Sequence, residues 1–191
     1  QWQHMVETYS QVTDNLELGI DARILETVVA LNLLSISTIS SCEGHLDHGT
    51  GAPWIDIAVP DIGPEAKAAR LAQMEAEKQA ALHQLPEEKI QELFKHAEQL
   101  RWQVSKKYLE ARKNIMQYLT LFYADRHVPY DRQLILQGQF LQNIAGPTRL
   151  ESQGVSVLAL YNTKIRQEKL AEYQDEMAAF THFLKQKLGL A

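Results

Sequence analysis

The chain has only one cysteine, and its acidic residues outnumber its basic ones. Of its 191 residues, 24 are Asp or Glu and 19 are Lys or Arg, which gives a formal net charge of −5. A single cysteine cannot form an internal disulfide, so a reducing cytoplasm is expected. The acidic balance disfavours a main role in non-specific nucleic-acid binding, because such proteins carry a basic footprint. A local basic groove is still compatible with it.

Long apolar runs are also missing. No stretch approaches the roughly 20 apolar residues that a membrane-spanning helix needs. The first residues lack the basic flank and apolar core of a signal peptide. We therefore expect a cytoplasmic protein without membrane contact. A content of 45% hydrophobic and 23% charged residues is ordinary for a globular protein, and the length predicts a single domain over 1–191.

Helical and strand patterns alternate along the chain, which predicts an α+β fold. Apolar residues at three- and four-residue spacing predict helices over 14–34, 64–83, 87–125 and 162–188. β-branched residues and two-residue alternation predict strands over 35–41, 54–59, 133–137 and 147–151. We expect a small, mostly antiparallel sheet of about four strands, packed on the first and last helices.

The segment 63–126 is predicted to form a long helical hairpin inserted between the second and third strands. Its second helix carries an apolar stripe from Ile90 to Phe122, which another helix or a second subunit must cover. Arg101 and Lys107 interrupt a strict heptad seam. This favours packing within the chain, with a homodimer through the hairpin as the alternative.

The chemistry of the chain is concentrated in residues 40–48, Ser-Ser-Cys-Glu-Gly-His-Leu-Asp-His. This segment lies in the expected loop between the first two strands. Two residues separate Cys42 from His45, and two separate His45 from His48. Zinc takes thiolate and imidazole ligands, so these three residues are candidate zinc ligands. A second separated pair is lacking, which favours an open or catalytic metal site over a closed structural one.

Two other interpretations of this segment remain open. Cys42 would be a catalytic nucleophile if His45 activated it and Asp56 or Asp47 oriented the imidazole. Glu43 opposes that role, because a neighbouring carboxylate raises the pKa of a thiol. Alternatively, Cys42 has a packing role at the strand end, since free cysteine is among the most buried residue types.

A small-ligand site is expected where the loop 41–53 meets the strands within 133–152. Gly44 allows the backbone to approach a ligand closely, and its amide can donate to an anion. The other ligand-binding candidates are Ser41, Glu43, Arg149 and Glu151. Of these, Arg149 and Glu151 are expected to face Cys42, His45 and Asp56.

The region 18–59 resembles a group of uncharacterised bacterial and phage proteins. The similarity rests on Leu-Gly-Ile at 18–20, an Ala-Leu-Asn helix end at 30–32, the Ser-Cys-Glu-Gly-His motif and Trp-Ile at 54–55. It implies a helix, a strand leading into the motif and a second strand. It implies no activity, because none is attached to that group.

The same motif is similar to one in the wybutosine-synthesis methyltransferases, which act on transfer RNA. Ser41, Cys42 and Gly44 match their Ser-Ser-Cys-Ser-Gly-Arg motif, whereas Glu43 and His45 replace its second serine and its arginine. This resemblance implies an RNA-modification-related protein. The sequence thus predicts a ligand or metal site, which can belong to an enzyme. The alternatives are a dimerising interaction module and an RNA-modification-related protein.

Overall fold

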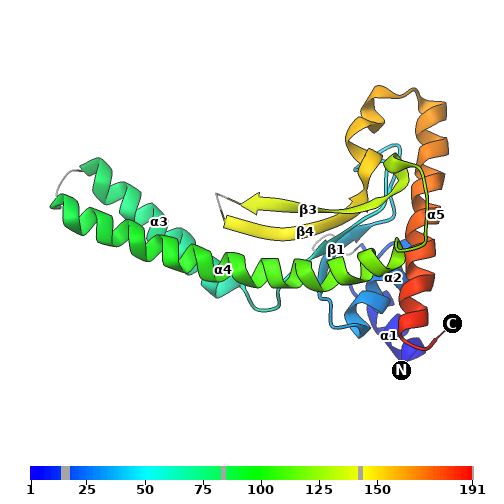
Figure 1. The fold of residues 1–191 in the computed structure, drawn as a ribbon, viewed down its shortest axis with the longest axis horizontal. Coiled ribbons are helices and arrows are strands. Elements are labelled where there is room, and N and C mark those ends of the chain that lie inside the picture. The colour runs from blue at the N-terminus through cyan, green and yellow to red at the C-terminus, as the bar shows by residue number, and fades with distance from the viewer. Residues whose placement is uncertain (14–17, 83–84, 142–143, 191) are drawn as a thin grey trace.

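The computed structural model describes residues 1–13, 18–82, 85–141 and 144–190. It shows an α+β protein with a four-stranded antiparallel sheet in the order β1-β2-β4-β3 (Figure 1). The helices are α1 (Trp2–Ser10), α2 (Ala22–Leu33), α3 (Gly63–Leu82), α4 (Glu87–Phe122) and α5 (Thr163–Lys187). The strands are β1 (Thr38–Cys42), β2 (Trp54–Ile57), β3 (Leu134–Leu141) and β4 (Ile144–Ser152). Short 3₁₀ segments span Tyr130–Arg132 and Gln153–Leu160.

The apolar face of the sheet forms the centre of the core. Ile55 of β2 lies opposite Leu150 of β4, and both side chains are fully buried. They share a cluster with Val28 of α2, Ile115 of α4 and Phe180 of α5. Burying each side chain of this size contributes about 1.5–3 kcal/mol. The pattern predicts only the first and last long helices on the sheet, but α4 is also part of this core.

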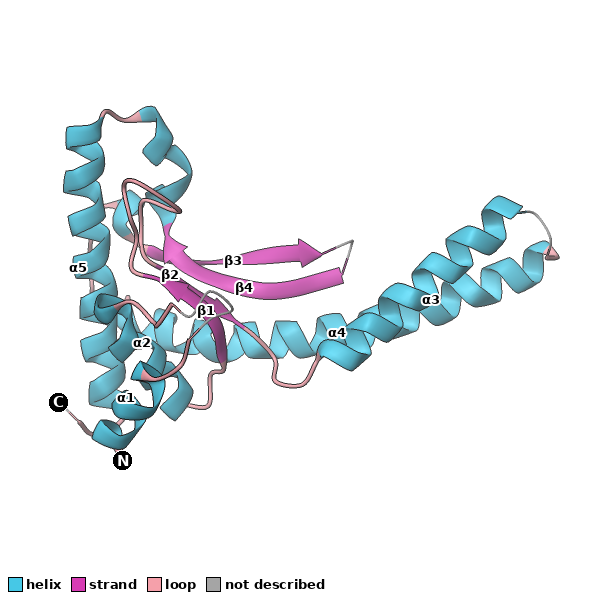
Figure 2. Ribbon diagram, turned by 180° about the vertical axis from the view of Figure 1, so that it is seen from behind, coloured by secondary structure: helices cyan, strands magenta, loops and turns pink. Residues whose placement is uncertain are grey.

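The helices α3 and α4 pair in an arm that projects from the body (Figure 2). Small side chains allow the two helices to approach, and Ala69, Ala76 and Ala97 are fully buried. Every position of the α4 stripe from Ile90 to Phe122 is buried or half-buried. The stripe is therefore covered within the chain, and it supplies no reason to expect a dimer through α4.

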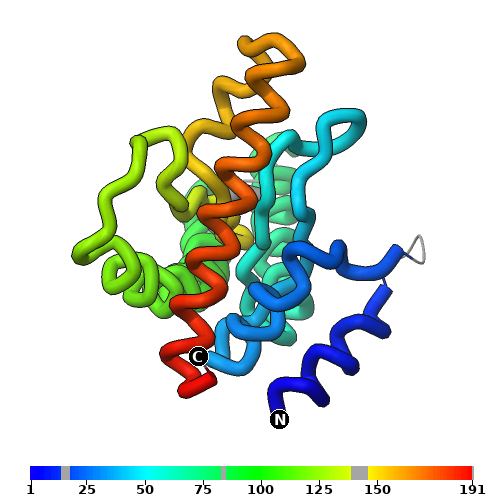
Figure 3. Tube along the Cα trace, turned by 90° about the vertical axis from the view of Figure 1, so that its right-hand side faces the viewer, coloured from blue at the N-terminus to red at the C-terminus, as the bar shows by residue number. Residues whose placement is uncertain are grey.

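The first predicted helix begins later than its pattern indicates. The pattern extends to residue 14, but α2 begins at Ala22, with Asp21 as its N-cap. Residues 14–17, where the predicted helix begins, lie outside the described residues. The sequence patterns also miss α1, which packs against α2 (Figure 3). With only nine residues, α1 is shorter than the window of about 11–18 residues over which helical spacing is recognised.

The strand boundaries shift for reasons of pairing and turn geometry. β1 begins at Thr38 rather than at 35, because Ser35 adopts a left-handed conformation with φ of 61° after α2. The second strand ends at Ile57 rather than at 59. β3 and β4 run over 134–141 and 144–152 because they pair with each other beyond the end of β2. The helix α4 ends at Phe122 rather than at 125.

Among the helices of the described residues, none is both long and apolar enough to span a bilayer.

Candidate functional site

The segment after β1 folds over the N-terminus of α2. The Glu43 backbone N–H donates to Asp21 Oδ2 at 2.9 Å, and Glu43 Oε2 accepts from the Arg23 backbone N–H at 3.0 Å. The second bond satisfies a free amide of the first helical turn and places negative charge at the positive end of the helix. Gln174 of α5 donates to the Glu43 carbonyl at 2.9 Å. The carboxylate of Glu43 thus holds the loop to α2.

Gly44 makes the tight turn of this loop. Its φ is +88°, and a Cβ added there would lie 2.6 Å from the carbonyl carbon of Ala52. Residues with a Cβ atom rarely adopt this backbone conformation. The amide of Gly44 donates to Cys42 Sγ at 3.3 Å. Gly44 therefore allows the expected close backbone approach, but the partner is the backbone of Ala52 rather than a ligand.

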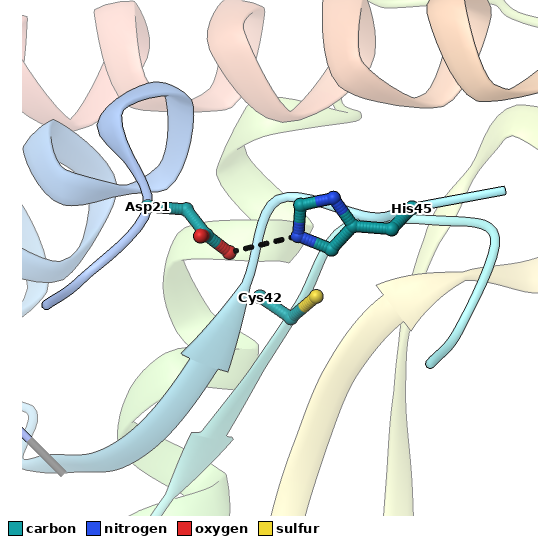
Figure 4. Close-up of side chains that lie close together, drawn as sticks. All are labelled: Asp21, Cys42 and His45. Atoms are coloured by element: carbon teal, nitrogen blue, oxygen red, sulfur yellow. Dashed lines mark hydrogen bonds and ion pairs between the residues drawn. The ribbon is translucent and has the colours of Figure 1, made fainter. Parts of the chain in front are cut away.

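Asp21, Cys42 and His45 converge beside this turn (Figure 4). One potential metal-ligand atom from each lies within 4.8 Å of those of the other two. His45 Nε2 lies 3.4 Å from Asp21 Oδ2. The backbone N–H of His45 donates to the Thr50 carbonyl at 3.0 Å, which closes the loop. All three side chains are half-buried, as metal ligands near a surface are.

His48 lies outside this group. Its ring stacks on His45 with 4.3 Å between centroids, and its Nδ1 lies 2.8 Å from Asp47 Oδ1. The structure therefore does not bring Cys42, His45 and His48 together as one set of ligands. His45 instead belongs to two groups, one with Asp21 and Cys42 and a more exposed one with Asp47 and His48.

The surroundings of the Cys42 thiol are negative. Burial raises its pKa most, and the carboxylates of Asp21 and Glu43 raise it further, although the Gly44 amide lowers it. A nucleophilic cysteine needs a lowered pKa from a nearby cation or helix N-terminus. The environment therefore disfavours Cys42 as an unaided nucleophile. It favours a cation, which would stabilise the thiolate.

The polar face of the sheet adjoins this group. Arg149 donates two hydrogen bonds to Asp56, at 2.8 and 2.9 Å, from the position directly opposite it. The guanidinium carbon lies 3.8 Å from the centroid of the Trp54 ring. Ser40 also donates to Asp56, at 3.0 Å. The catalytic candidate Asp56 and the ligand candidate Arg149 thus form an ion pair with each other, and Asp56 does not orient His45.

The remaining candidates, Glu151 and Ser41, lie on opposite faces of the sheet. Glu151 is opposite Trp54 on the polar face and only 6% exposed, and burial raises the pKa of its carboxyl. Ser41 is paired with Ile55, whose side chain lies in the core. Two-residue alternation therefore places Ser41 on the face away from Cys42.

Asp21 is the site residue that the sequence patterns miss. Its signal is an aspartate directly before Ala22, three residues ahead of the buried Ile24. This is the usual position of a helix N-cap. The predicted helix extends back to residue 14, so Asp21 falls inside it and is not recognised as an N-cap. The contact with Cys42 also depends on tertiary packing between segments about 20 residues apart.

Comparison with known proteins does not extend these observations. No family model matches the chain, and no curated protein or solved structure matches it significantly.

Proposed function

We propose that this protein binds one divalent transition metal, with zinc as the best match, through Asp21, Cys42 and His45. The supporting observation is the convergence of a carboxylate, a thiol and an imidazole, with ligand atoms within 4.8 Å of one another. Zinc bonds of about 2.0–2.3 Å place tetrahedral ligand atoms roughly 3.5 Å apart. The 3.4 Å between Asp21 Oδ2 and His45 Nε2 already agrees with this spacing.

The contacts around the three ligands support the proposal. The Gly44 amide donates to Cys42 Sγ, and the Glu43 amide donates to Asp21 Oδ2. Such hydrogen bonds orient ligands and tune a metal site. The mixed thiolate, imidazole and carboxylate set suits zinc rather than magnesium or calcium, which prefer oxygen ligands.

Three protein ligands leave a fourth zinc position for water or a small ligand. Zinc at such a position lowers the pKa of bound water or polarises a carbonyl group. A cavity of about 370 Å³ lies next to the loop, lined in part by Arg23, Glu43 and Gln174. Its volume falls in the range of small-ligand sites. Its lining does not include Asp21, Cys42 or His45, so the proposal is a metal site with a neighbouring cavity for a small ligand.

Metal analysis of protein purified without a histidine tag tests the proposal. We expect close to one zinc per chain, and a thiolate-to-metal charge-transfer band after replacement by Co²⁺. Cys42→Ser should abolish the band, and Asp21→Asn should lower zinc content, with native circular dichroism in both variants. His48→Ala is the matched control and should retain zinc. Folded wild-type protein that neither retains nor takes up zinc would overturn the proposal.

A further inference from the structure

The outer face of α3 carries apolar side chains that nothing in the described structure covers. Leu71, Met74 and Leu82 are 49%, 55% and 47% exposed. They lie on the side of α3 opposite Ala69 and Ala76, the fully buried positions that face α4. Single exposed apolar residues are common. Here, however, three share one face of a helix that projects from the body (Figure 1).

Two charged residues complete this face. Glu75 and Lys78 are exposed and lie between Leu71 and Leu82 on the same side of α3. Consider an antiparallel second copy of α3, related by a two-fold axis midway between Glu75 and Lys78. Each residue then lies opposite the residue of the second copy that is equally far from this axis along the helix. Leu71 then lies opposite Leu82 of the second copy, and Glu75 lies opposite Lys78. The face therefore pairs leucine with leucine and opposite charges with each other, as a self-complementary isologous interface requires.

The outer face of α4 behaves differently. Trp102, Leu109 and Met116 are 64%, 51% and 46% exposed at seven-residue spacing, with Lys106 and Lys113 between them. Pairing two copies of this face in an antiparallel manner about Leu109 brings Lys106 near Lys113 of the second copy. Such contacts repel. Of the two outer faces of the arm, only that of α3 suits a second copy of the chain.

We propose that the protein forms a two-fold dimer through antiparallel α3 helices, with Leu71 on Leu82 and Glu75 on Lys78 of the second copy. A polar residue within an apolar seam commonly fixes register, and Lys78 with Glu75 has that role here. One pair of 20-residue helices is a small interface, below the roughly 1,200 Å² of standard stable complexes. The dimer is therefore weak, and its population rises with protein concentration over the micromolar range.

Sedimentation equilibrium of the full chain over a range of concentrations tests this proposal. We expect wild type to move from monomer to dimer, and Leu71→Asp to remain a monomer with unchanged circular dichroism. Leu109→Asp changes an equally exposed leucine on the outer face of α4, and it should dimerise as wild type does. A wild type that stays monomeric at high concentration would overturn the proposal, as would a dimer that Leu109→Asp abolishes and Leu71→Asp does not.

A charge exchange tests the register. Glu75→Lys alone places four lysines at the centre of the interface, and it should weaken the dimer at least tenfold. Adding Lys78→Glu to that variant restores alternating charges, and it should recover most of the lost affinity. If the double variant is as weak as the single one, the antiparallel register is wrong. Zinc content should be unaffected throughout, which separates this proposal from that of the metal site.

Discussion

Two clusters of ionisable residues in this protein differ in how their charge is balanced. Glu176 is fully buried, and two guanidinium groups surround it. Arg126 donates to both of its oxygens at 2.9 and 2.7 Å, and Arg132 lies 3.3 Å away. The Tyr123 hydroxyl donates to Glu176 at 3.1 Å and accepts from the Leu134 amide at 2.7 Å. This cluster joins the end of α4 and the start of β3 to α5.

The group around Cys42 has the opposite balance. Asp21, Glu43 and the thiol lie close together, and among the described residues the only ion pair of Asp21 is with His45. Within the described part of the chain, Glu43 has backbone and amide contacts but no ion pair with an arginine or lysine. The carboxylate that joins elements of the fold, that of the fully buried Glu176, is thus neutralised by two arginines. Around Cys42, the residues that the structure describes give the negative charge no lysine or arginine in an ion pair, which supports the proposed metal site.

The largest expected effect is at the balanced cluster. Glu176→Gln leaves Arg126 and Arg132 without their counter-charge. Breaking a buried ion pair costs about 3–5 kcal/mol, and the partial exposure of both arginines places this variant near the lower end, at about 3 kcal/mol. Denaturant unfolding measures the loss, and zinc content per folded chain should not change. If Glu176→Gln lost zinc but no stability, the Glu176 cluster would not be the structural one, and the contrast with the Cys42 group would be wrong.

Gly44→Ala should damage the metal site through its backbone. The positive φ and the contact with Ala52 cost about 1–3 kcal/mol. The displaced turn should also lose zinc. Gly49→Ala is the control: its φ of +65° is also positive, but an added Cβ there meets nothing within 4 Å. It should lose less stability and keep its metal. Equal zinc loss in both variants would mean that the turn at Gly44 does not position the ligands.

Asp21→Asn tests the electrostatic origin of the Cys42 environment in metal-free protein. Asp21 raises the pKa of the thiol by its charge and by a hydrogen bond. The variant should therefore have a lower thiol pKa and react several-fold faster with a thiol reagent at neutral pH. Asp47→Asn removes a more distant carboxylate and should leave the rate unchanged. A rate that Asp21→Asn does not raise would show that burial alone sets the pKa.

The smallest expected effect is at Glu151. Because burial raises the pKa of its carboxyl in the folded protein, the group contributes most stability below the unfolded pKa of about 4.3. That contribution is lost as pH rises through the folded value. Glu151→Gln should therefore be more stable than wild type at pH 7 and equal to it below about pH 4. A difference that stays constant with pH would show that Glu151 does not titrate as its burial indicates.

Local patterns predict much of the fold but less of the site. Alternation in 54–59 and helical spacing in 87–125 correctly indicate a strand and a long helix, because both patterns follow from burial of one face. Arg149 faces Asp56, as expected from the sequence, because the register of β2 and β4 places the two residues opposite each other. Asp21 reaches Cys42 only because the loop folds over the start of α2. Long-range packing therefore places Asp21 beside Cys42 and His45, where sequence spacing favours His48.

Anomalous diffraction at the zinc absorption edge, from crystals grown with zinc, tests the central claim most directly. We expect one strong peak about 2.3 Å from Cys42 Sγ and about 2.0–2.2 Å from His45 Nε2 and an Asp21 carboxylate oxygen. Small side-chain rotations would bring the three ligand atoms to these distances. A peak held by His45, Asp47 and His48, or no peak near Cys42, would contradict it.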